Sequence, residues 1–178
     1  MNNRPLFVVA IALLSMLGGA ALYQLLQPQS LTGTTAGEQA PIDLRAIPLS
    51  GLDQRETQLR DWHSDLLLVN FWAPWCAPCR REIPSLIQVQ NEYAGRGLRV
   101  LGIAFDGEDQ VRRFAAEHQI DYPLFLARGR AAMYNAAFGN PSGSLPFTAL
   151  LDRELKPVFR HNGEMSLAAL RELLDKSL

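Results

Sequence analysis

Reactive sulfur and imidazole are scarce in this sequence of 178 residues, which has two cysteines and three histidines. A structural metal site usually takes about four such ligands. His63, His118 and His161 lie far apart, with no spacing typical of metal ligands. The sequence therefore predicts no resident metal ion, and nothing in it indicates another cofactor.

Excess charge of either sign is missing as well. The 17 basic and 18 acidic residues leave a formal net charge of −1. Nucleic-acid binding depends on clustered basic residues that neutralise phosphates, so we predict no nucleic-acid partner. With 48% hydrophobic and 20% charged residues, the composition is typical of a packed globular protein. The length fits one ordinary domain with an appendage.

Charge is absent altogether from Leu6 to Leu26, which reads LFVVAIALLSMLGGAALYQLL. A helix of about 20 such residues spans the apolar core of a bilayer. A cleavable signal peptide is the alternative, because Gly18–Ala21 offers small residues for cleavage. The run is longer than the ~7–15-residue core of a signal peptide, and Tyr23 lies where an aromatic residue would anchor a helix at the membrane interface. We expect residues 1–26 to form an uncleaved signal anchor or transmembrane helix.

The residues that follow predict a tether and an exported domain. Residues 27–40, QPQSLTGTTAGEQA, are small and polar, as in a flexible linker. Arg4 precedes the apolar run, so the positive-inside rule keeps the N-terminus in the cytoplasm. We therefore expect residues 41–178 to fold on the periplasmic, extracytoplasmic side of the inner (cytoplasmic) membrane, held there by a single span.

Residues 41–178 alternate between short apolar runs and amphipathic stretches. The expected strands are Leu44–Leu49, Leu66–Phe71, Arg99–Phe105, Pro123–Leu126, Phe147–Leu151 and Pro157–Arg160. The expected helices are Cys79–Tyr93, Glu108–His118, Arg130–Phe138 and a last one capped by Ser166. Strands that alternate with helices predict a three-layer α/β sandwich with a central mixed sheet, in which the last two strands are antiparallel.

The two cysteines form a CAPC motif at residues 76–79, and three interpretations compete for it. A structural disulfide across so short a loop would remove little entropy from the unfolded chain. A metal site, including a Cu(I)-binding dithiol module, would need further ligands, and Met133 and Met165 are isolated. A redox-active dithiol at the start of a helix explains the motif best. There the helix N-terminus favours the thiolate of Cys76, and Cys79, one turn later, can resolve a mixed disulfide.

The run FWAPWCAPC, from Phe71 to Cys79, resembles the active site of the thioredoxin superfamily. Asn70, Glu82, Pro84 and an additional strand and helix between Arg99 and His118 make the chain similar to the TlpA/ResA-like, membrane-anchored thiol:disulfide oxidoreductases. The resemblance extends over nearly all of residues 41–178, and it implies a thioredoxin-like fold for them.

The resemblance also implies roles for particular residues. Cys76 matches the nucleophile and Cys79 the resolving thiol of a redox-active disulfide, and Pro146 matches the cis-proline opposite that disulfide. A cis peptide bond there would leave the backbone of Leu145 free to pair with an extended substrate. The residues expected to bind substrate are Trp75, Ala77, Pro78 and Leu145.

Charged and polar side chains beside the motif allow two interpretations each. Glu82 matches a glutamate near the active site of ResA-like proteins and would assist deprotonation of Cys79; otherwise it is a solvated residue that favours the helix dipole. Burial decides between these interpretations. Arg80 and Arg81 either favour the thiolate or are solvated arginines, which is the interpretation we prefer. Asn70 stands where cytoplasmic thioredoxins carry a buried aspartate, and we interpret it as a structural polar group.

The sequence therefore predicts a thiol:disulfide oxidoreductase that reduces disulfides of exported proteins. The resemblance suggests cytochrome c maturation or the reduction of metallochaperones. Because an exported domain lies beyond cytoplasmic reductants, we expect a membrane-embedded electron donor as a partner. A disulfide oxidase or isomerase is one alternative, although such enzymes more often carry a histidine where Pro78 stands. A peroxiredoxin-like antioxidant is another, although Ala73 replaces the hydroxyl residue that positions the peroxide.

Overall fold

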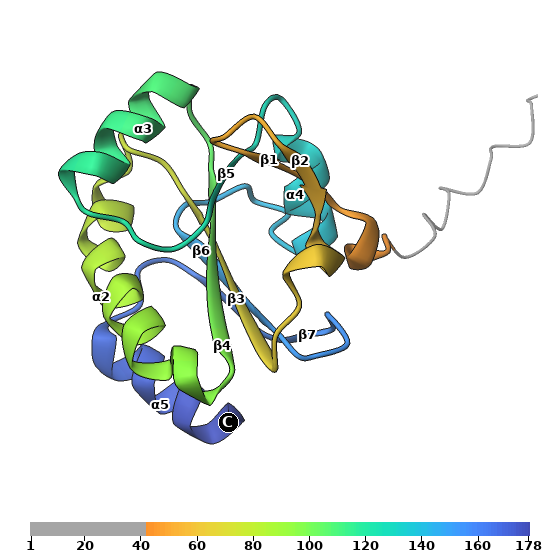
Figure 1. The fold of residues 1–178 in the computed structure, drawn as a ribbon, viewed down its shortest axis with the longest axis vertical. Coiled ribbons are helices and arrows are strands. Elements are labelled where there is room, and N and C mark those ends of the chain that lie inside the picture. The colour runs from red at the N-terminus through yellow and green to blue at the C-terminus, as the bar shows by residue number, and fades with distance from the viewer. Residues whose placement is uncertain (1–41) are drawn as a thin grey trace, which may run out of the picture. The chain divides into compact units, whose positions relative to one another are not determined.

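A seven-stranded mixed sheet runs through residues 42–178, the part of the chain that the computed structural model describes (Figure 1). The strands are β1 Pro48–Gly51, β2 Glu56–Gln58, β3 Leu66–Trp72, β4 Leu98–Ala104, β5 Leu124–Leu126, β6 Phe147–Leu151 and β7 Pro157–Asn162. Their order across the sheet is β2-β1-β5-β4-β3-β6-β7. The pairs β3–β4 and β4–β5 are parallel, and the other pairs are antiparallel.

Helices cover both faces of this sheet. They are α2 Ala77–Tyr93, α3 Glu108–Glu117, α4 Ala131–Phe138 and α5 Leu167–Ser177. Side chains of α2, α3 and α5 pack into one apolar cluster with one face of the sheet. Side chains of α4 pack into a second cluster with the opposite face. The predicted three-layer α/β sandwich with a central mixed sheet, and its antiparallel last two strands, are confirmed.

The central strand β3 explains why the sheet needs a helical layer on each side. All seven of its residues are buried. Leu68 and Trp72 belong to the cluster beneath α2, whereas Val69 and Phe71 belong to the cluster beneath α4. Successive side chains of a strand point to opposite faces, so an almost wholly apolar strand has both faces buried, as predicted.

The start of the domain differs from the prediction in two places. Residues Leu44–Ala46 form a 3₁₀ helix instead of the first part of a strand, and β1 begins only at Pro48. The carboxylate of Asp43 accepts the backbone N–H of Arg45 at 3.0 Å, and such local side-chain bonds compete with strand pairing. The short polar strand Glu56–Gln58 was not predicted, because it has no apolar alternation.

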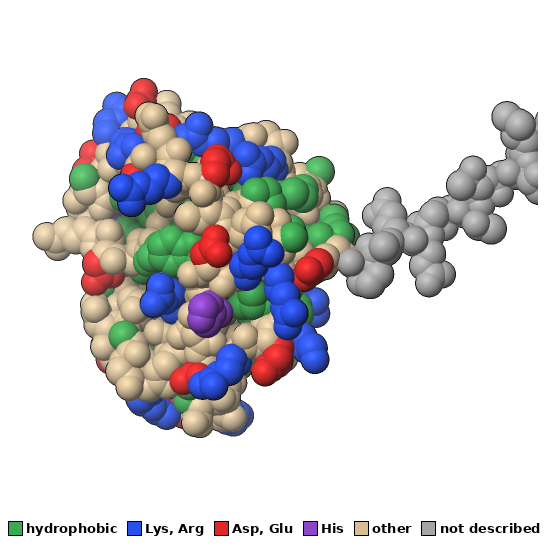
Figure 2. Space-filling view, turned by 45° about the vertical axis from the view of Figure 1, so that its right-hand side comes forward, with side chains coloured by type: hydrophobic (Ala, Val, Ile, Leu, Met, Phe, Trp, Pro, Cys, Tyr) green, Lys and Arg blue, Asp and Glu red, His purple; other side chains and the backbone are tan. Residues whose placement is uncertain are grey.

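Residues 1–41 lie outside the described part of the chain, and with them the predicted anchor at 1–26 and linker at 27–40. Within residues 42–178, none of the helices has the length and apolar character needed to cross a membrane. On the face of the domain drawn in Figure 2, acidic and basic side chains lie side by side. That mixture agrees with the near-zero net charge of the chain.

Candidate active site at the Cys76–Cys79 disulfide

A tight turn after β3 delivers Cys76 to the start of α2. The carbonyl of Ala73 accepts the N–H of Cys76 at 3.1 Å, and the helix begins with the next residue, Ala77. Pro78 occupies the first helical turn, where a missing N–H has no consequence because those groups lack helical partners. Cys76 is therefore the N-cap of α2, which agrees with its predicted place at the helix N-terminus, although the helix begins two residues earlier than the predicted Cys79.

Cys76 and Cys79 form a disulfide, with their Cα atoms 5.3 Å apart. The Sγ atom of Cys76 also accepts the backbone N–H of Cys79 at 3.3 Å. Cys79 is fully buried, whereas Cys76 keeps 5% of its surface accessible. In the reduced protein, the N–H donor and the positive end of the helix dipole would stabilise a thiolate at Cys76. Of the two cysteines, only Cys76 therefore has accessible surface.

The residues predicted to bind substrate come from two segments at the same end of the sheet, the turn that holds the cysteines and the loop before β6. Trp75 is 67% exposed, Ala77 is exposed and Pro78 is half-buried. Leu145 and Pro146 precede β6, whose Phe147 lies opposite Phe71 of β3. They therefore lie at the edge where β3 ends and α2 begins.

The peptide bond between Leu145 and Pro146 is cis, as the resemblance implies. Pro146 accepts the N–H of Gly163 through its carbonyl at 2.8 Å. Among residues 42–178, the N–H and C=O of Leu145 make no backbone hydrogen bond. Leu145 contacts both apolar clusters with its side chain, which leaves its backbone as the free polar part of this segment.

Glu82 is buried beneath the disulfide-bearing turn, with 1% of its surface exposed. Its Oε2 atom accepts a hydrogen bond from Nδ2 of Asn70 at 3.2 Å, and its Oε1 atom accepts one from the backbone N–H of Met165 at 3.0 Å. Burial raises the pKa of Glu82 to about 7, although the two hydrogen bonds lower it and the nearby Glu164 adds a further rise. The alternative of a solvated glutamate is therefore wrong.

Asn70 ties three elements together behind the cysteines. Its Nδ2 atom donates to Glu82 of α2 and, at 3.0 Å, to Oγ1 of Thr148 in β6. The Oδ1 atom of Asn70 has no partner among residues 42–178, and neither has Nε1 of Trp72 nor the hydroxyl of Tyr122. Buried polar atoms without partners are rare, which makes this region unusual within the core.

Gly102, the residue of β4 that pairs with Asn70, lies beside the Trp72 and Tyr122 rings. A Cβ atom at Gly102 would lie 3.0 Å from Nε1 of Trp72 and 3.2 Å from Cε2 of Tyr122. Sequence reasoning assigned no role to Thr148, Tyr122 or the backbone of Met165. No local pattern marks them, because each reaches the site from a distant part of the chain.

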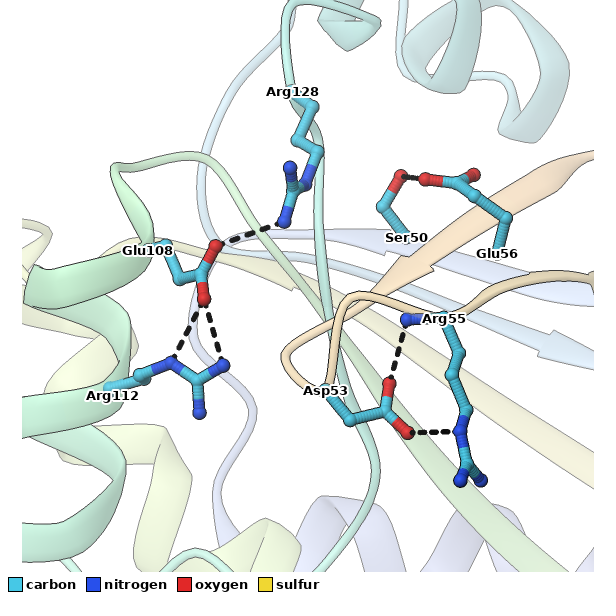
Figure 3. Close-up of polar contacts among 7 residues, drawn as sticks. All are labelled: Ser50, Asp53, Arg55, Glu56, Glu108, Arg112 and Arg128. Carbon is cyan, nitrogen blue, oxygen red and sulfur yellow. Dashed lines mark hydrogen bonds and ion pairs between the residues drawn. The ribbon is translucent and has the colours of Figure 1, made fainter.

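The start of α3 shows what an ordinary polar surface looks like in this domain (Figure 3). Glu108 pairs with Arg112 at 2.8 Å and with Arg128 at 2.9 Å. Ser50 donates to Glu56 at 2.5 Å in the nearby hairpin of β1 and β2. These charges satisfy one another. Across residues 42–178, no three His, Cys, Asp or Glu side chains gather as metal ligands would.

Comparisons with known proteins agree with this site. Residues 36–156 match the model of the AhpC/TSA family. The chain is 33% identical over 176 residues to the thioredoxin-like protein YneN of Bacillus subtilis (strain 168), covering 95% of this chain and 96% of that protein. It is 27% identical over 177 residues to the thiol-disulfide oxidoreductase ResA of Bacillus thuringiensis (strain Al Hakam), covering 98% and 97%.

A solved structure extends the likeness to three dimensions. The thiol:disulfide interchange protein of the thioredoxin family from Chlorobium tepidum TLS aligns with a TM-score of 0.66 at 25% identity, covering 79% of this chain and 99% of that one. The expected thioredoxin-like fold of the described residues is confirmed.

Proposed function

We propose, from the premise that the chain belongs to the AhpC/TSA family of thioredoxin-like proteins and is a thiol-disulfide oxidoreductase, that it reduces disulfides in exported proteins. The observation that carries this proposal is the disulfide at the start of α2, with Cys76 as the helix N-cap and Cys79 fully buried. One accessible and one protected sulfur are what a two-step exchange requires.

The exchange starts from the dithiol form. The thiolate of Cys76 attacks one sulfur of the substrate disulfide, forms a mixed disulfide and releases the first substrate thiolate. Cys79 then loses its proton and attacks the Cys76 sulfur. This step forms the Cys76–Cys79 disulfide and releases the second substrate thiolate, so two electrons pass from the protein to the substrate.

Glu82 is the proposed proton acceptor for Cys79. It lies three residues after Cys79 in α2, about one helical turn, and both side chains are buried. A carboxyl group with a pKa of about 7 is half ionised near neutral pH, which suits general acid–base catalysis. The resolving step should therefore accelerate as the pH rises through about 7, and the Glu82→Gln variant should lose that inflection.

The backbone of Leu145 is the proposed docking site for an extended substrate chain. Its unpaired N–H and C=O groups can add an extended peptide to the edge of the site. Trp75, Ala77 and Pro78 form the opposite side, where the exposed Trp75 ring offers an apolar contact. Pro146 holds the segment at the start of β6.

Membrane anchoring and the electron supply are further parts of the proposal. Residues 1–26 would hold the domain at the extracytoplasmic side of the cytoplasmic membrane, with 27–40 as the tether. A membrane-embedded donor would return the Cys76–Cys79 pair to its dithiol form after each cycle. The proposed clients are exported disulfide proteins, with apocytochromes c and metallochaperones as the classes to test first.

The alternative as a peroxidase has less support from the site. Ala73, three residues before Cys76, is buried and carries no hydroxyl that could position a peroxide.

The direction of exchange separates the reductase from an oxidase. A Cys76–Cys79 reduction potential of about −270 mV, the value of thioredoxin, supports a reductase, whereas one of about −120 mV, the value of DsbA, contradicts it.

Trapping of the mixed disulfide tests the proposed roles of the two cysteines. Reduced wild-type protein is mixed with a peptide that contains one intramolecular disulfide, and released thiols are counted. We expect turnover with the wild type, an accumulated covalent adduct with Cys79→Ser, and no adduct with Cys76→Ser. An adduct that forms through Cys79 instead of Cys76 would reverse the assigned roles.

A further inference from the structure

The first turn of α2 has an unusual charge for a helix start. Acidic residues stabilise this position because the helix dipole is positive there, and α3 follows the rule with Glu108 and Asp109. The first turn of α2 contains no acidic residue, and Arg80 and Arg81 follow directly after the second cysteine. Helix stability therefore does not explain this pair of arginines.

The two arginines differ in their partners. Arg81 pairs with Glu164 at 2.5 Å. Arg80 makes no ion pair among residues 42–178, and its guanidinium lies instead 5.9 Å from the centre of the Phe114 ring in α3. A guanidinium that packs on an aromatic ring keeps its N–H donors available for a second partner.

A hollow of about 390 Å³ opens beside the redox motif at this point. It is lined by Ala77, the residue after Cys76, and by Arg80, Arg81 and His118. The imidazole of His118 stacks on the Phe114 ring with the ring centres 3.8 Å apart. Its Nδ1 atom donates to the Phe114 carbonyl at 3.0 Å, which holds the ring in place at the wall of the hollow.

We propose that this hollow receives an acidic side chain of the substrate polypeptide, next to the disulfide that Cys76 attacks, and that Arg80 is the residue that selects it. The inference rests on the proposed function and names a feature of its substrates. A carboxylate is the expected group because it matches the planar donors of a guanidinium. The adjacent positive end of α2 favours the same charge.

A set of matched peptides tests the selection. The peptides share one intramolecular disulfide and carry Glu, Gln or Lys at the first or second residue on either side of one cysteine. Their kcat/KM values are measured for the full-length wild type, Arg80→Gln, Arg80→Glu and Arg99→Gln. Arg99 is the matched control, because it also lies over an aromatic ring, 5.7 Å from the centre of Trp62, at the start of β4 and away from the motif.

The expected result is a preference of the wild type for Glu over Gln at one of these positions. The ratio should reach up to about fivefold at low ionic strength, the range of exposed charge pairs, and shrink in high salt. Arg99→Gln should keep the ratio, Arg80→Gln should bring it to about one, and Arg80→Glu should prefer the Lys peptide. Thermal unfolding confirms that each variant is folded.

Two results would overturn the inference: equal turnover of all peptides by the wild type, or a Glu preference that survives in Arg80→Gln. The proposed function fails in a different way, because then none of the peptides is reduced. Turnover without discrimination therefore contradicts only the acidic-substrate inference.

Discussion

Helices α2 and α3 follow neighbouring parallel strands and begin at the same edge of the sheet, but their first turns are built differently. The start of α3 has a glycine N-cap and two acidic residues, and Glu108 faces outward between two arginines. The start of α2 has a cysteine N-cap, a proline and no acidic residue. The one glutamate of its second turn, Glu82, faces inward and is buried.

The start of α3 is built for stability, whereas the start of α2 is built for chemistry. At α3 the charges agree with the helix dipole and with one another. At α2 the positive helix end is left for the Cys76 sulfur, and a carboxyl group is buried at an energetic cost. Sites that violate local rules in this way are usually functional.

The largest expected effect comes from removing the buried carboxyl group. Glu82 has a pKa of about 7 in the folded protein, against 4.5 for an ordinary glutamate side chain. The folded state therefore binds the proton more tightly, and the stability from this group is full below about pH 4.5 and lost as the pH rises through about 7. The loss corresponds to about 3 kcal/mol in the free energy of unfolding.

Urea unfolding of the oxidised wild type and of Glu82→Gln at pH 5 and pH 8 measures this effect. The variant should be more stable relative to the wild type at pH 8 than at pH 5, because glutamine does not ionise. Glu108→Gln is the control from the start of α3. An equal difference between wild type and Glu82→Gln at both pH values would show that Glu82 does not titrate in this range.

A smaller effect is expected from the donor that holds Glu82. Asn70→Leu removes the hydrogen bonds that the side-chain amide donates to Glu82 and Thr148. At pH 8 this should lower the free energy of unfolding by about 2 kcal/mol, since a hydrogen bond to a charged group contributes about 1.5–3 kcal/mol. It should also raise the pKa of Glu82 further, because a donor to the carboxylate is lost. Thr148→Val, which removes only the neutral bond, should cost about 1 kcal/mol. Equal losses in both variants would mean that Asn70 does not support the carboxylate.

The smallest expected effect compares the two helix starts directly. Arg80→Glu should stabilise the protein by about 0.5 kcal/mol, because it places an acidic residue near the start of α2. Glu108→Gln should destabilise it by about 0.5–1 kcal/mol, because it weakens the start of α3 and removes two exposed ion pairs. Thermal unfolding at low and high salt measures both changes, which should shrink in high salt. Changes of the same sign would remove the distinction between the two helices.

Much of the fold was predictable from short-range patterns. The wholly apolar run of β3 indicated a strand buried on both faces, and α3, α4 and β6 lie within two residues of their predicted bounds. The helix after the cysteines begins at Ala77 rather than Cys79, because the side chain of Cys76 caps it by accepting the N–H of Cys79. The strand Glu56–Gln58 could not be predicted, because pairing with β1 and not its own pattern makes it a strand.

The sequence by itself determined the redox pair, since two cysteines at this spacing behind a buried strand have few other uses. It could not determine the state of Glu82, which depends on Met165, 83 residues away, and on Asn70 in another element. Nor could it show that His118, at the end of α3, lines the same hollow as Arg80 of α2. Local pattern decides which elements form, because propensity and periodicity act over neighbouring residues. Burial, pKa values and the shape of a surface depend on residues that only packing brings together. Only the tertiary structure therefore decided these three properties.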